Sequence, residues 1–163
     1  MPERVTNIKP IKQDLTGQET KDYMVWLENF LRSQKTLVLA TCHDNIPYCN
    51  LMSFALTEES KSLILITPVV TVKYENMSQN RHVSLLIRDD HDPVTFEKGT
   101  VVTINGTASE IQGSNRSEAE DLIIAKYPEL EDFARSSETA VFRVYFQKAI
   151  LVRHFQLLTE INF

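Results

Sequence analysis

The sequence predicts a single, mainly β domain in which about six antiparallel strands form a small barrel with flanking helices. Short, β-rich apolar runs bounded by turn residues recur along the chain, and only a few stretches have helical periodicity. Gly106 interrupts a long β-rich segment, which predicts a bulge or close backbone approach of the kind that bends a sheet into a barrel. A chain of 163 residues is long enough to bury one self-sufficient core.

Composition places the chain among ordinary globular proteins. Apolar residues make up 42% of the chain and charged residues 24%, so we do not expect a disordered protein. The 17 basic and 22 acidic side chains give a net charge of −5, which argues against a nucleic-acid surface. The sequence has no apolar run of transmembrane length and no signal-peptide core, so we expect a cytoplasmic protein without a membrane or nucleic-acid partner.

The N-terminal part predicts an arm followed by a helix. Residues 1–20 are polar and irregular, and we expect them to form an arm that precedes one domain over residues 21–163. Thr20 can cap a helix, and residues 21–34 carry apolar side chains at helical spacing. This stripe predicts an amphipathic helix that covers the core.

Three β-rich segments follow the helix and predict a three-stranded antiparallel meander. The predicted strands cover residues 36–42, 48–57 and 62–67. Between the first two lie Asp44 and Asn45, which tolerate the left-handed conformation of tight turns. A polar turn over residues 58–61 leads to the third strand.

The second half of the chain alternates helices with longer strands. The expected helices cover residues 71–80, residues 117–127 and a short piece ending at Arg135, and the expected strands cover residues 82–89, 99–112 and 139–155. Ser117 and Glu120 predict a capping box, and Pro128 ends that helix. The acidic segment 89–98 predicts a loop, and residues 139–155 predict one bent strand or two.

The junction between the strand at 62–67 and the helix at 71–80 is the most informative stretch. Thr67, Thr71 and Lys73 gather where the first amides of a helix lack intrahelical acceptors. Hydroxyl groups, an ammonium group and free amides together suit an anion such as phosphate. A lysine in the first helical turn is unfavourable against the helix dipole unless an anion lies nearby, which favours this interpretation over a merely solvated charge.

Other chemistry-bearing residues show no comparable pattern. Cys42 and Cys49 lack a second pair or a histidine at zinc-ligand spacing, so we interpret both as structural or incidental thiols. None of the four histidines has a ligand at helical spacing, and no metal site is predicted; His91 lies among aspartates that suit either a solvated loop or a hard cation. Without a G-x-S-x-G or G-x-G-x-x-G motif, no catalytic acid, base or nucleophile is assigned.

Three blocks of the sequence occur in an order and spacing that carry a family resemblance. They are LATCHDNIPYCNLMSF, LILITPVVTVKYENMSQNRHVSLLI and VVTINGTASEI. Together they resemble the flavin-binding split barrels related to pyridoxamine 5′-phosphate oxidase, over residues 21–155. The resemblance implies a six-stranded antiparallel split β-barrel that binds FMN at the interface of a homodimer, with some site residues supplied by the partner subunit.

The resemblance also implies a set of cofactor-binding residues. Those that would edge the flavin ring, largely through backbone groups, are Asn50, Leu51, Met52 and Ser53. Those near the ribityl chain would be Thr67 and Pro68. Those at the phosphate would be Thr71 and Lys73, with Asn76 shaping the start of the helix.

Val72 departs from the family pattern, in which a second cation often stands at this position. A charge-assisted hydrogen bond contributes about 1.5–3 kcal/mol. Its loss would weaken cofactor binding roughly ten- to a hundredfold. Arg81 and Arg88 are the neighbouring candidates to supply the missing charge.

Three functions stay open from the sequence. The first is an FMN-dependent oxidoreductase that passes electrons or hydride between a reduced nicotinamide or protein donor and a small molecule. Oxidation of pyridoxamine phosphate is a narrower version, against which the ending LLTEINF lacks that enzyme's basic segment. The second function keeps the barrel and binds a deazaflavin or haem, with His154 as a distant candidate axial ligand. The third is a flavin-binding or regulatory dimer without catalysis.

Overall fold

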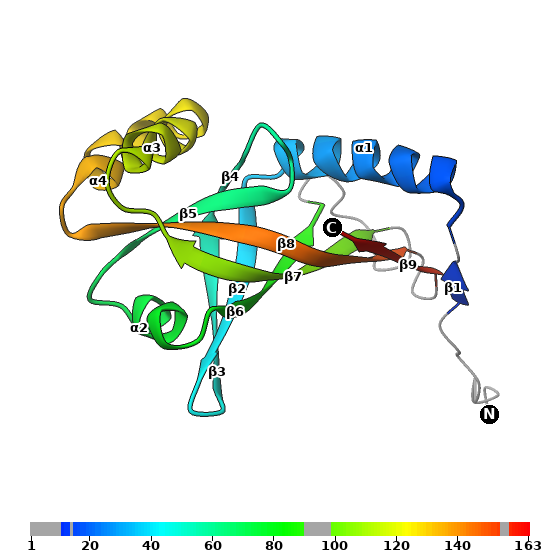
Figure 1. Ribbon diagram of the computed structural model, residues 1–163, viewed down its shortest axis with the longest axis horizontal. Helices are drawn as coiled ribbons and strands as arrows, with labels where there is room; N and C mark the ends of the chain where they lie inside the picture. The colour runs from blue at the N-terminus through cyan, green and yellow to red at the C-terminus, as the bar shows by residue number, and fades with distance from the viewer. Residues whose placement is uncertain (1–10, 14, 90–98, 154–156) are drawn as a thin grey trace, which may run out of the picture.

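The computed structural model describes residues 11–13, 15–89, 99–153 and 157–163. Within these ranges one curled, mostly antiparallel sheet forms a split barrel, with helices packed along its sides and end (Figure 1). The predicted fold class is therefore confirmed. The loop expected over 89–98 and most of the arm expected over 1–20 lie outside the described residues.

The six strands expected from the sequence are present, with three short additions among the described residues. The strands are β1 (Ile11–Gln13), β2 (Thr36–His43), β3 (Ile46–Ser53), β4 (Ala55–Leu56), β5 (Ser62–Pro68), β6 (His82–Arg88), β7 (Thr100–Glu110), β8 (Thr139–Arg153) and β9 (Leu157–Asn162). The helices are α1 (Gly17–Ser33), α2 (Val72–Gln79), α3 (Asn115–Lys126) and α4 (Glu131–Arg135), with a 3-10 turn η1 (Pro128–Leu130).

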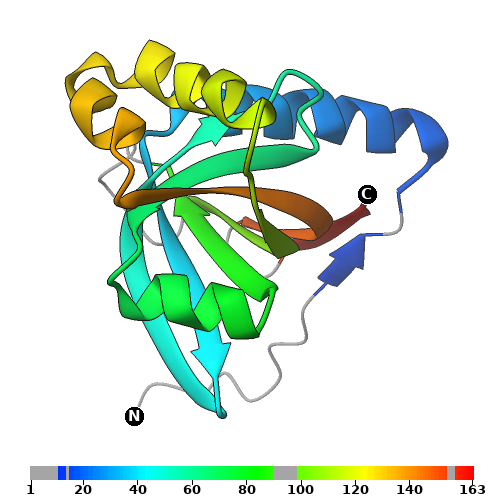
Figure 2. The ribbon, with the colours of Figure 1, turned by 60° about the vertical axis from the view of Figure 1, so that its left-hand side comes forward.

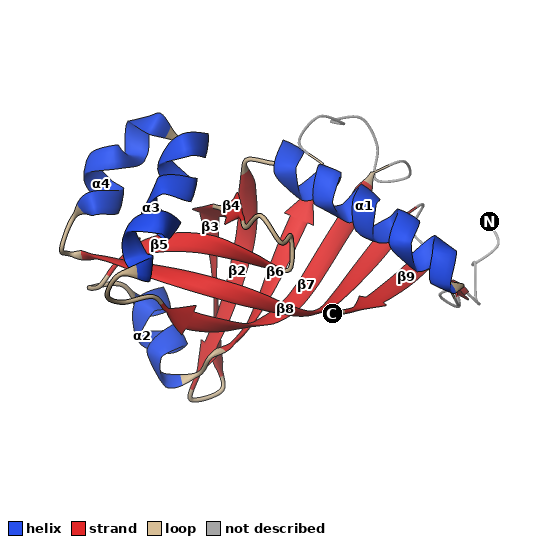
Figure 3. Cartoon of the chain, turned by 45° about the horizontal axis from the view of Figure 1, so that its top comes forward, coloured by secondary structure: helices blue, strands red, loops and turns tan. Residues whose placement is uncertain are grey.

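The strand order is β1-β9-β8-β7-β6-β2-β3, and β8 pairs in addition with β5, which carries β4 (Figure 3). All ladders are antiparallel except β1–β9. The three predicted segments pair in the predicted order, but the middle one is divided into β3, which pairs with β2, and β4, which pairs with β5. β5 also pairs with β8, and no described ladder joins β5 to β3. The barrel is split between β3 and β5.

The strand predicted over residues 48–57 is interrupted at Phe54, which divides it into β3 and β4. Phe54 is fully buried, and its carbonyl accepts a hydrogen bond of 3.1 Å from the hydroxyl of Tyr127. The same hydroxyl also bonds the carbonyl of Lys35 at the entry to β2. A buried carbonyl needs a partner, and this one is supplied by α3 rather than by a neighbouring strand. The chain therefore leaves β3 and redirects into β4 and β5.

Helix α1 begins at Gly17, inside the segment that the sequence assigned to an irregular arm. The Thr16 hydroxyl accepts from the amide of Glu19 at 3.4 Å, and the Glu19 carboxylate accepts from the amide of Thr16 at 2.9 Å. This reciprocal capping box starts the helix one turn early. The buried face of α1 is formed by Leu27, Phe30 and Leu31.

The turn between β2 and β3 and the glycine in β7 behave as predicted. Asp44 and Asn45 have φ values of 50° and 61°, which identifies a two-residue hairpin turn. At Gly106 the β7–β8 register shifts, and an added Cβ would lie 2.4 Å from the carbonyl oxygen of Tyr145. Only glycine permits this close crossing, which bends the sheet.

The capping box predicted for α3 is wrong. Ser114 precedes the helix without a capping side-chain bond, so α3 starts before Ser117. Glu120 is buried and pairs with Arg116 at 2.6 Å and with Arg135 at 2.9 Å. A buried carboxylate needs charged partners, so Glu120 joins α3 to α4 instead of reaching back to a helix-start amide.

The structure has two hydrophobic cores. The larger fills the barrel, is closed on one side by α1, and includes Leu39, Leu85 and Ile104. The smaller lies where α3 and α4 cover the outer side of β5 and β8, and includes Ile64, Ile123 and Val141 (Figure 2). Since β5 faces a core on each side, its apolar run is continuous. No helix in the described ranges is long and apolar enough to cross a membrane.

Candidate functional site

The junction between β5 and α2 brings two threonine hydroxyls together. Thr67 is buried at the end of β5, and its Oγ1 lies 3.0 Å from Oγ1 of Thr71. Thr71 caps α2, because its hydroxyl accepts from the amide of Tyr74 at 3.4 Å. The same hydroxyl donates to the carbonyl of Pro68 at 2.9 Å. The hydroxyl pair and the start of α2 are thus fixed against the end of β5.

Lys73 stands in the first turn of α2 without a partner. It is half-buried, and it has no hydrogen bond or ion pair with any residue in the described ranges. The backbone amides of Val72 and Lys73 lack intrahelical acceptors, as at the start of any helix. An uncompensated cation beside free amides and hydroxyls forms a site complementary to an anion.

The two arginines expected to replace the missing cation are placed elsewhere. Arg81 follows the other end of α2, about 12 Å along the helix axis from its first turn. Its Nε donates to the carbonyl of Ala108 at 3.0 Å, so it links α2 to β7. Arg88 ends β6, where it pairs with Val101 of β7. Lys73 is therefore the only lysine or arginine of α2.

Asn76 lies on the opposite face of α2 from solvent. Its side chain is buried, and Nδ2 donates to Oγ1 of Thr41 at 3.0 Å. Asn80, at the end of the helix, donates to the carbonyl of Cys42 at 2.9 Å. These two bonds hold α2 against β2, so Asn76 helps to fix the position of the helix and of its first turn.

The predicted ring-edging residues on β3 are divided between the two faces of the sheet. Pairing with β2 places Asn50 and Met52 on the face of the barrel interior, whereas Leu51 and Ser53 face outward. Met52 is buried and Leu51 is 71% exposed. The residues share instead the backbone of β3, whose outer edge has no ladder partner in the described sheet. Because their side chains face opposite sides of the sheet, these four residues can contact one ligand together only through their backbone groups.

Asn50 carries the sharpest sign of a missing ligand. Its Oδ1 atom is buried, and no hydrogen-bond partner for it exists among the described residues. Buried acceptors are satisfied in most native structures. Both α2 and β5 contact β3, the strand that carries Asn50.

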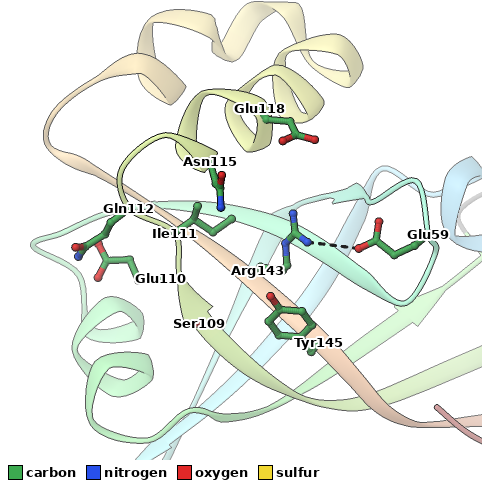
Figure 4. A pocket seen from close by; sticks show the side chains of 9 residues that line it. All are labelled: Glu59, Ser109, Glu110, Ile111, Gln112, Asn115, Glu118, Arg143 and Tyr145. Carbon is green, nitrogen blue, oxygen red and sulfur yellow. Dashed lines mark hydrogen bonds and ion pairs between the residues drawn. The ribbon is translucent and has the colours of Figure 1, made fainter.

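A separate cavity of about 500 Å³ lies on the outer side of β7 and β8, below the start of α3 (Figure 4). Arg143 projects into it and pairs with Glu59 at 3.4 Å, and Tyr145 lies next to Arg143 along β8. The pKa of the Glu59 carboxyl is lowered, mainly because the carboxylate accepts a hydrogen bond from its own backbone amide. The nearby charge of Arg143 lowers this pKa further. None of the residues predicted for the flavin lines this cavity.

The sequence reasoning did not single out Arg143 and Tyr145. Both stand at alternate positions of a strand that is otherwise largely apolar, TAVFRVYF. Polar side chains at i and i+2 of a buried strand mark one face that leaves the core. This alternation in the sequence could have predicted that Arg143 and Tyr145 lie on an accessible outer face of β8.

Metal chemistry finds no support in the described part of the chain. No cluster of three or more histidine, cysteine or carboxylate side chains occurs there. Cys42 is half-buried and Cys49 is exposed, and both thiols are free. His91 and His154 lie outside the described residues.

Solved structures share this fold at low sequence identity. A haem-binding protein from Mycobacterium smegmatis superposes with a TM-score of 0.76 at 14% identity, covering 83% of this chain and 56% of that protein. The haem storage protein HutZ from Vibrio cholerae gives a TM-score of 0.65 at 15% identity, with 78% and 90% covered. An FAD-binding protein from Mesorhizobium loti gives 0.65 at 17% identity, also with 78% and 90% covered.

These likenesses establish the fold, and the sequence establishes the family. This chain spans little more than half of the Mycobacterium smegmatis protein. A comparison with curated protein sequences gave no significant match. The sequence profile described as pyridoxamine 5′-phosphate oxidase matches residues 27–153, which is most of the chain. The protein therefore belongs to the pyridoxamine 5′-phosphate oxidase family.

Proposed function

We propose that the protein binds FMN with its phosphate at the β5–α2 junction and acts as a flavin-dependent oxidoreductase on a small molecule. The observation that carries this proposal is the unpartnered Lys73 beside the Thr67–Thr71 hydroxyl pair. Bound FMN would supply the redox chemistry, and the protein would hold and orient it. A reduced nicotinamide or a protein is the proposed electron donor.

The residues present fit a phosphate held by one side-chain cation. Lys73 would neutralise part of the phosphate charge, and the first amides of α2 would donate to its oxygens. Thr71 can donate either to Thr67 or to Pro68, so one of these contacts can be exchanged for a phosphate oxygen. Val72 contributes no charge, and the site is proposed to bind FMN more weakly than a two-cation site would.

The ring of the flavin is proposed to lie against the free edge of β3. The backbone groups at the unpaired edge of a strand seek partners, and a flavin ring carries both donors and acceptors at its rim. The buried Oδ1 of Asn50 would accept a hydrogen bond from the imide N–H of the ring. Leu51 and Ser53 would take part through their backbone.

A homodimer is proposed to form through the outer face of β3, β2 and β6. The ladder registers place Leu51 opposite Val38 and Val38 opposite Leu86, so the three side chains form a row across three strands. Leu51 is 71% exposed and Leu86 is 44% exposed. An apolar row of this kind on a sheet face marks an interaction surface, and a second copy of the chain would cover it.

Haem is the second candidate for the cofactor, favoured by a specific feature of the turn. Val69, Val70 and Val72 are all exposed around the single cation, and Val70 is 91% exposed. An apolar rim with one positive charge also suits a large apolar ring that carries carboxylates. Two of the structural relatives described above bind or store haem. A deazaflavin, or a flavin-binding dimer without turnover, would require the same phosphate site.

The test is a visible absorption spectrum of the purified protein, followed by titration with FMN and with haem. Twin flavin bands and quenched FMN fluorescence are the expected result, and a Soret band on haem titration without FMN binding would replace the proposal by the haem alternative. Lys73→Ala should weaken FMN binding roughly ten- to a hundredfold. Lys61→Ala, at an exposed lysine in the turn before β5, is the matched control.

Dimerisation is tested separately by sedimentation. Leu51→Glu and Leu86→Glu should each shift the protein toward a monomer, because a carboxylate would be buried in the proposed interface. Val25→Glu, at an exposed apolar position on α1, should leave the mass unchanged. A wild-type monomer, or equal effects of all three variants, would exclude this interface without affecting the FMN assignment.

A further inference from the structure

Lys126 is half-buried and lines a cavity. It lies in the last turn of α3, and its Nζ donates to the carbonyl of Gln34 at 2.6 Å. The same atom lies 4.1 Å from the centroid of the Phe54 ring. It also lines a cavity of about 270 Å³ that Arg32 borders from α1. This cavity shares no residue with the proposed FMN site.

The surroundings of Lys126 favour the uncharged form of its amine. Burial is the larger cause that lowers the pKa of Lys126 to about 8, and repulsion from the Arg32 guanidinium is the smaller one. Glu28 is engaged by Arg32 at 2.9 Å, and no described carboxylate lies within ion-pair distance of Lys126. The neighbouring phenol, Tyr127, is kept neutral by a raised pKa caused by burial. About a quarter of the Lys126 amine is therefore uncharged at pH 7.5.

Arg32 is placed to hold an anion at the other end of the cavity. Its Nε and Nη2 atoms contact Glu28, the carbonyl of Thr57 and the hydroxyl of Ser60. Nη1 has no partner among the described residues, and the guanidinium is 45% exposed. The remaining wall is apolar and consists of Ala55, Leu56, Leu122 and Ala125.

We propose that Lys126 is a covalent attachment site, at which its amine forms an imine with a small aldehyde whose anionic group pairs with Arg32. The lone pair of Nζ attacks the carbonyl carbon, a C–N bond forms, and the carbonyl oxygen leaves as water after proton transfer from nitrogen. No oxidant or reductant is needed. The cavity lies below the usual size range of ligand pockets, so the aldehyde has only a few carbon atoms.

The surroundings of Nζ suit the product as well as the amine. A protonated imine carries its positive charge at the position that the ammonium group occupies above Phe54, so the cation–π contact is retained. The free Nη1 of Arg32 can donate to an oxygen of either a carboxylate or a phosphate group.

The experiment is reductive trapping followed by peptide mapping. Wild-type protein is incubated at pH 7.5 with glyoxylate and cyanoborohydride, and the rate of adduct formation at Lys126 is compared with that at the exposed Lys61 in the same digest. Lys126 should react at least about tenfold faster, because a far larger fraction of its amine is uncharged. Glyceraldehyde 3-phosphate in a parallel incubation separates preference for phosphate from preference for carboxylate.

Two variants and a neutral aldehyde complete the test. Lys126→Arg keeps a cation above Phe54 and should abolish the adduct at this position. Arg32→Gln removes the repulsion that helps to lower the pKa of Lys126, so it should slow the reaction with propionaldehyde somewhat. It should slow the reaction with glyoxylate roughly tenfold more than that, because the contact with the carboxylate is lost as well. Equal rates at Lys126 and Lys61, or equal slowing of the glyoxylate and propionaldehyde reactions in Arg32→Gln, would overturn the proposal. Neither outcome bears on FMN binding.

Discussion

The side-chain amide of Asn76 donates a hydrogen bond of 3.0 Å to the hydroxyl of Thr41 across a buried contact between α2 and β2. The Thr41 hydroxyl lies in turn 3.4 Å from the carbonyl of Tyr48 on β3. This chain of contacts ties the helix that begins at the candidate phosphate site to the hairpin that carries Asn50. The distance between the two halves of the site therefore depends on a residue that need not touch the cofactor.

Replacement of Asn76 by alanine should reduce the free energy of unfolding. The change removes a buried hydrogen bond and leaves a small cavity, so we expect a loss of about 1–3 kcal/mol. Urea denaturation followed by circular dichroism measures it. Ser78→Ala, which removes an exposed bond to the carbonyl of Tyr74 on the same helix, should cost less than about 0.5 kcal/mol. Equal losses in the two variants would show that the Asn76 contact contributes nothing particular.

Replacement of Gly106 by alanine should destabilise the barrel. The new Cβ would lie 2.4 Å from the carbonyl oxygen of Tyr145, a backbone atom that cannot move without shifting β8. We expect a cost of about 1–3 kcal/mol, typical of overpacking. Gly17→Ala is the control, because nothing lies within 4 Å of a Cβ at that position. A Gly106→Ala protein with the thermal midpoint of wild type would contradict the close crossing of β7 and β8.

Replacement of Val72 by arginine should strengthen FMN binding. The Val72 side chain is 53% exposed in the first turn of α2, so a longer side chain can be accommodated. A second cation at the proposed phosphate should increase affinity about tenfold or more, with a steeper salt dependence. Fluorescence titration at two salt concentrations measures both effects. Val25→Arg on α1 adds the same charge away from the site, and equal affinities for the two variants would rule out phosphate at this turn.

The stability of the protein should rise with pH between about 8 and about 9.5. The pKa of Lys126 in the folded protein is lowered to about 8, whereas a lysine in an unfolded chain titrates near 10.4. Within this window the unfolded chain binds more protons than the folded protein, so raising the pH favours folding. The pH window ends before tyrosines titrate. Because burial raises the pKa of Tyr127, its titration at higher pH would lower the stability of the folded protein.

The measurement is the urea midpoint at several pH values across this window. Lys126→Met removes the titrating group and should flatten the pH dependence. A midpoint that falls with pH in the wild-type protein, or the same slope in Lys126→Met, would contradict the assigned environment of Lys126.

Much of the local structure could be predicted from neighbouring residues. The hairpin turn at Asp44 and Asn45, the helix that starts after Thr71 and the close approach at Gly106 are confirmed, because each is set by backbone preferences within a few residues. The early start of α1 was missed although its capping box, Thr16 and Glu19, is local, whereas the start of α3 was mispredicted because of a partner more distant in the sequence. Glu120 pairs with Arg135 instead of capping its own helix, since only the packing of α4 on α3 provides that arginine.

For the candidate site, the sequence by itself determined the grouping of Thr67, Thr71 and Lys73, because a strand end and a helix start that follow each other must share one corner of the fold. Only the tertiary structure decided how β3 contributes. Its pairing with β2 turns Leu51 outward and Asn50 inward, and its neighbours leave the Asn50 oxygen buried without a partner. The environment of Lys126 likewise depends on α1 and Phe54 meeting the end of α3, because burial and charge repulsion arise from residues about seventy to ninety positions away in the sequence.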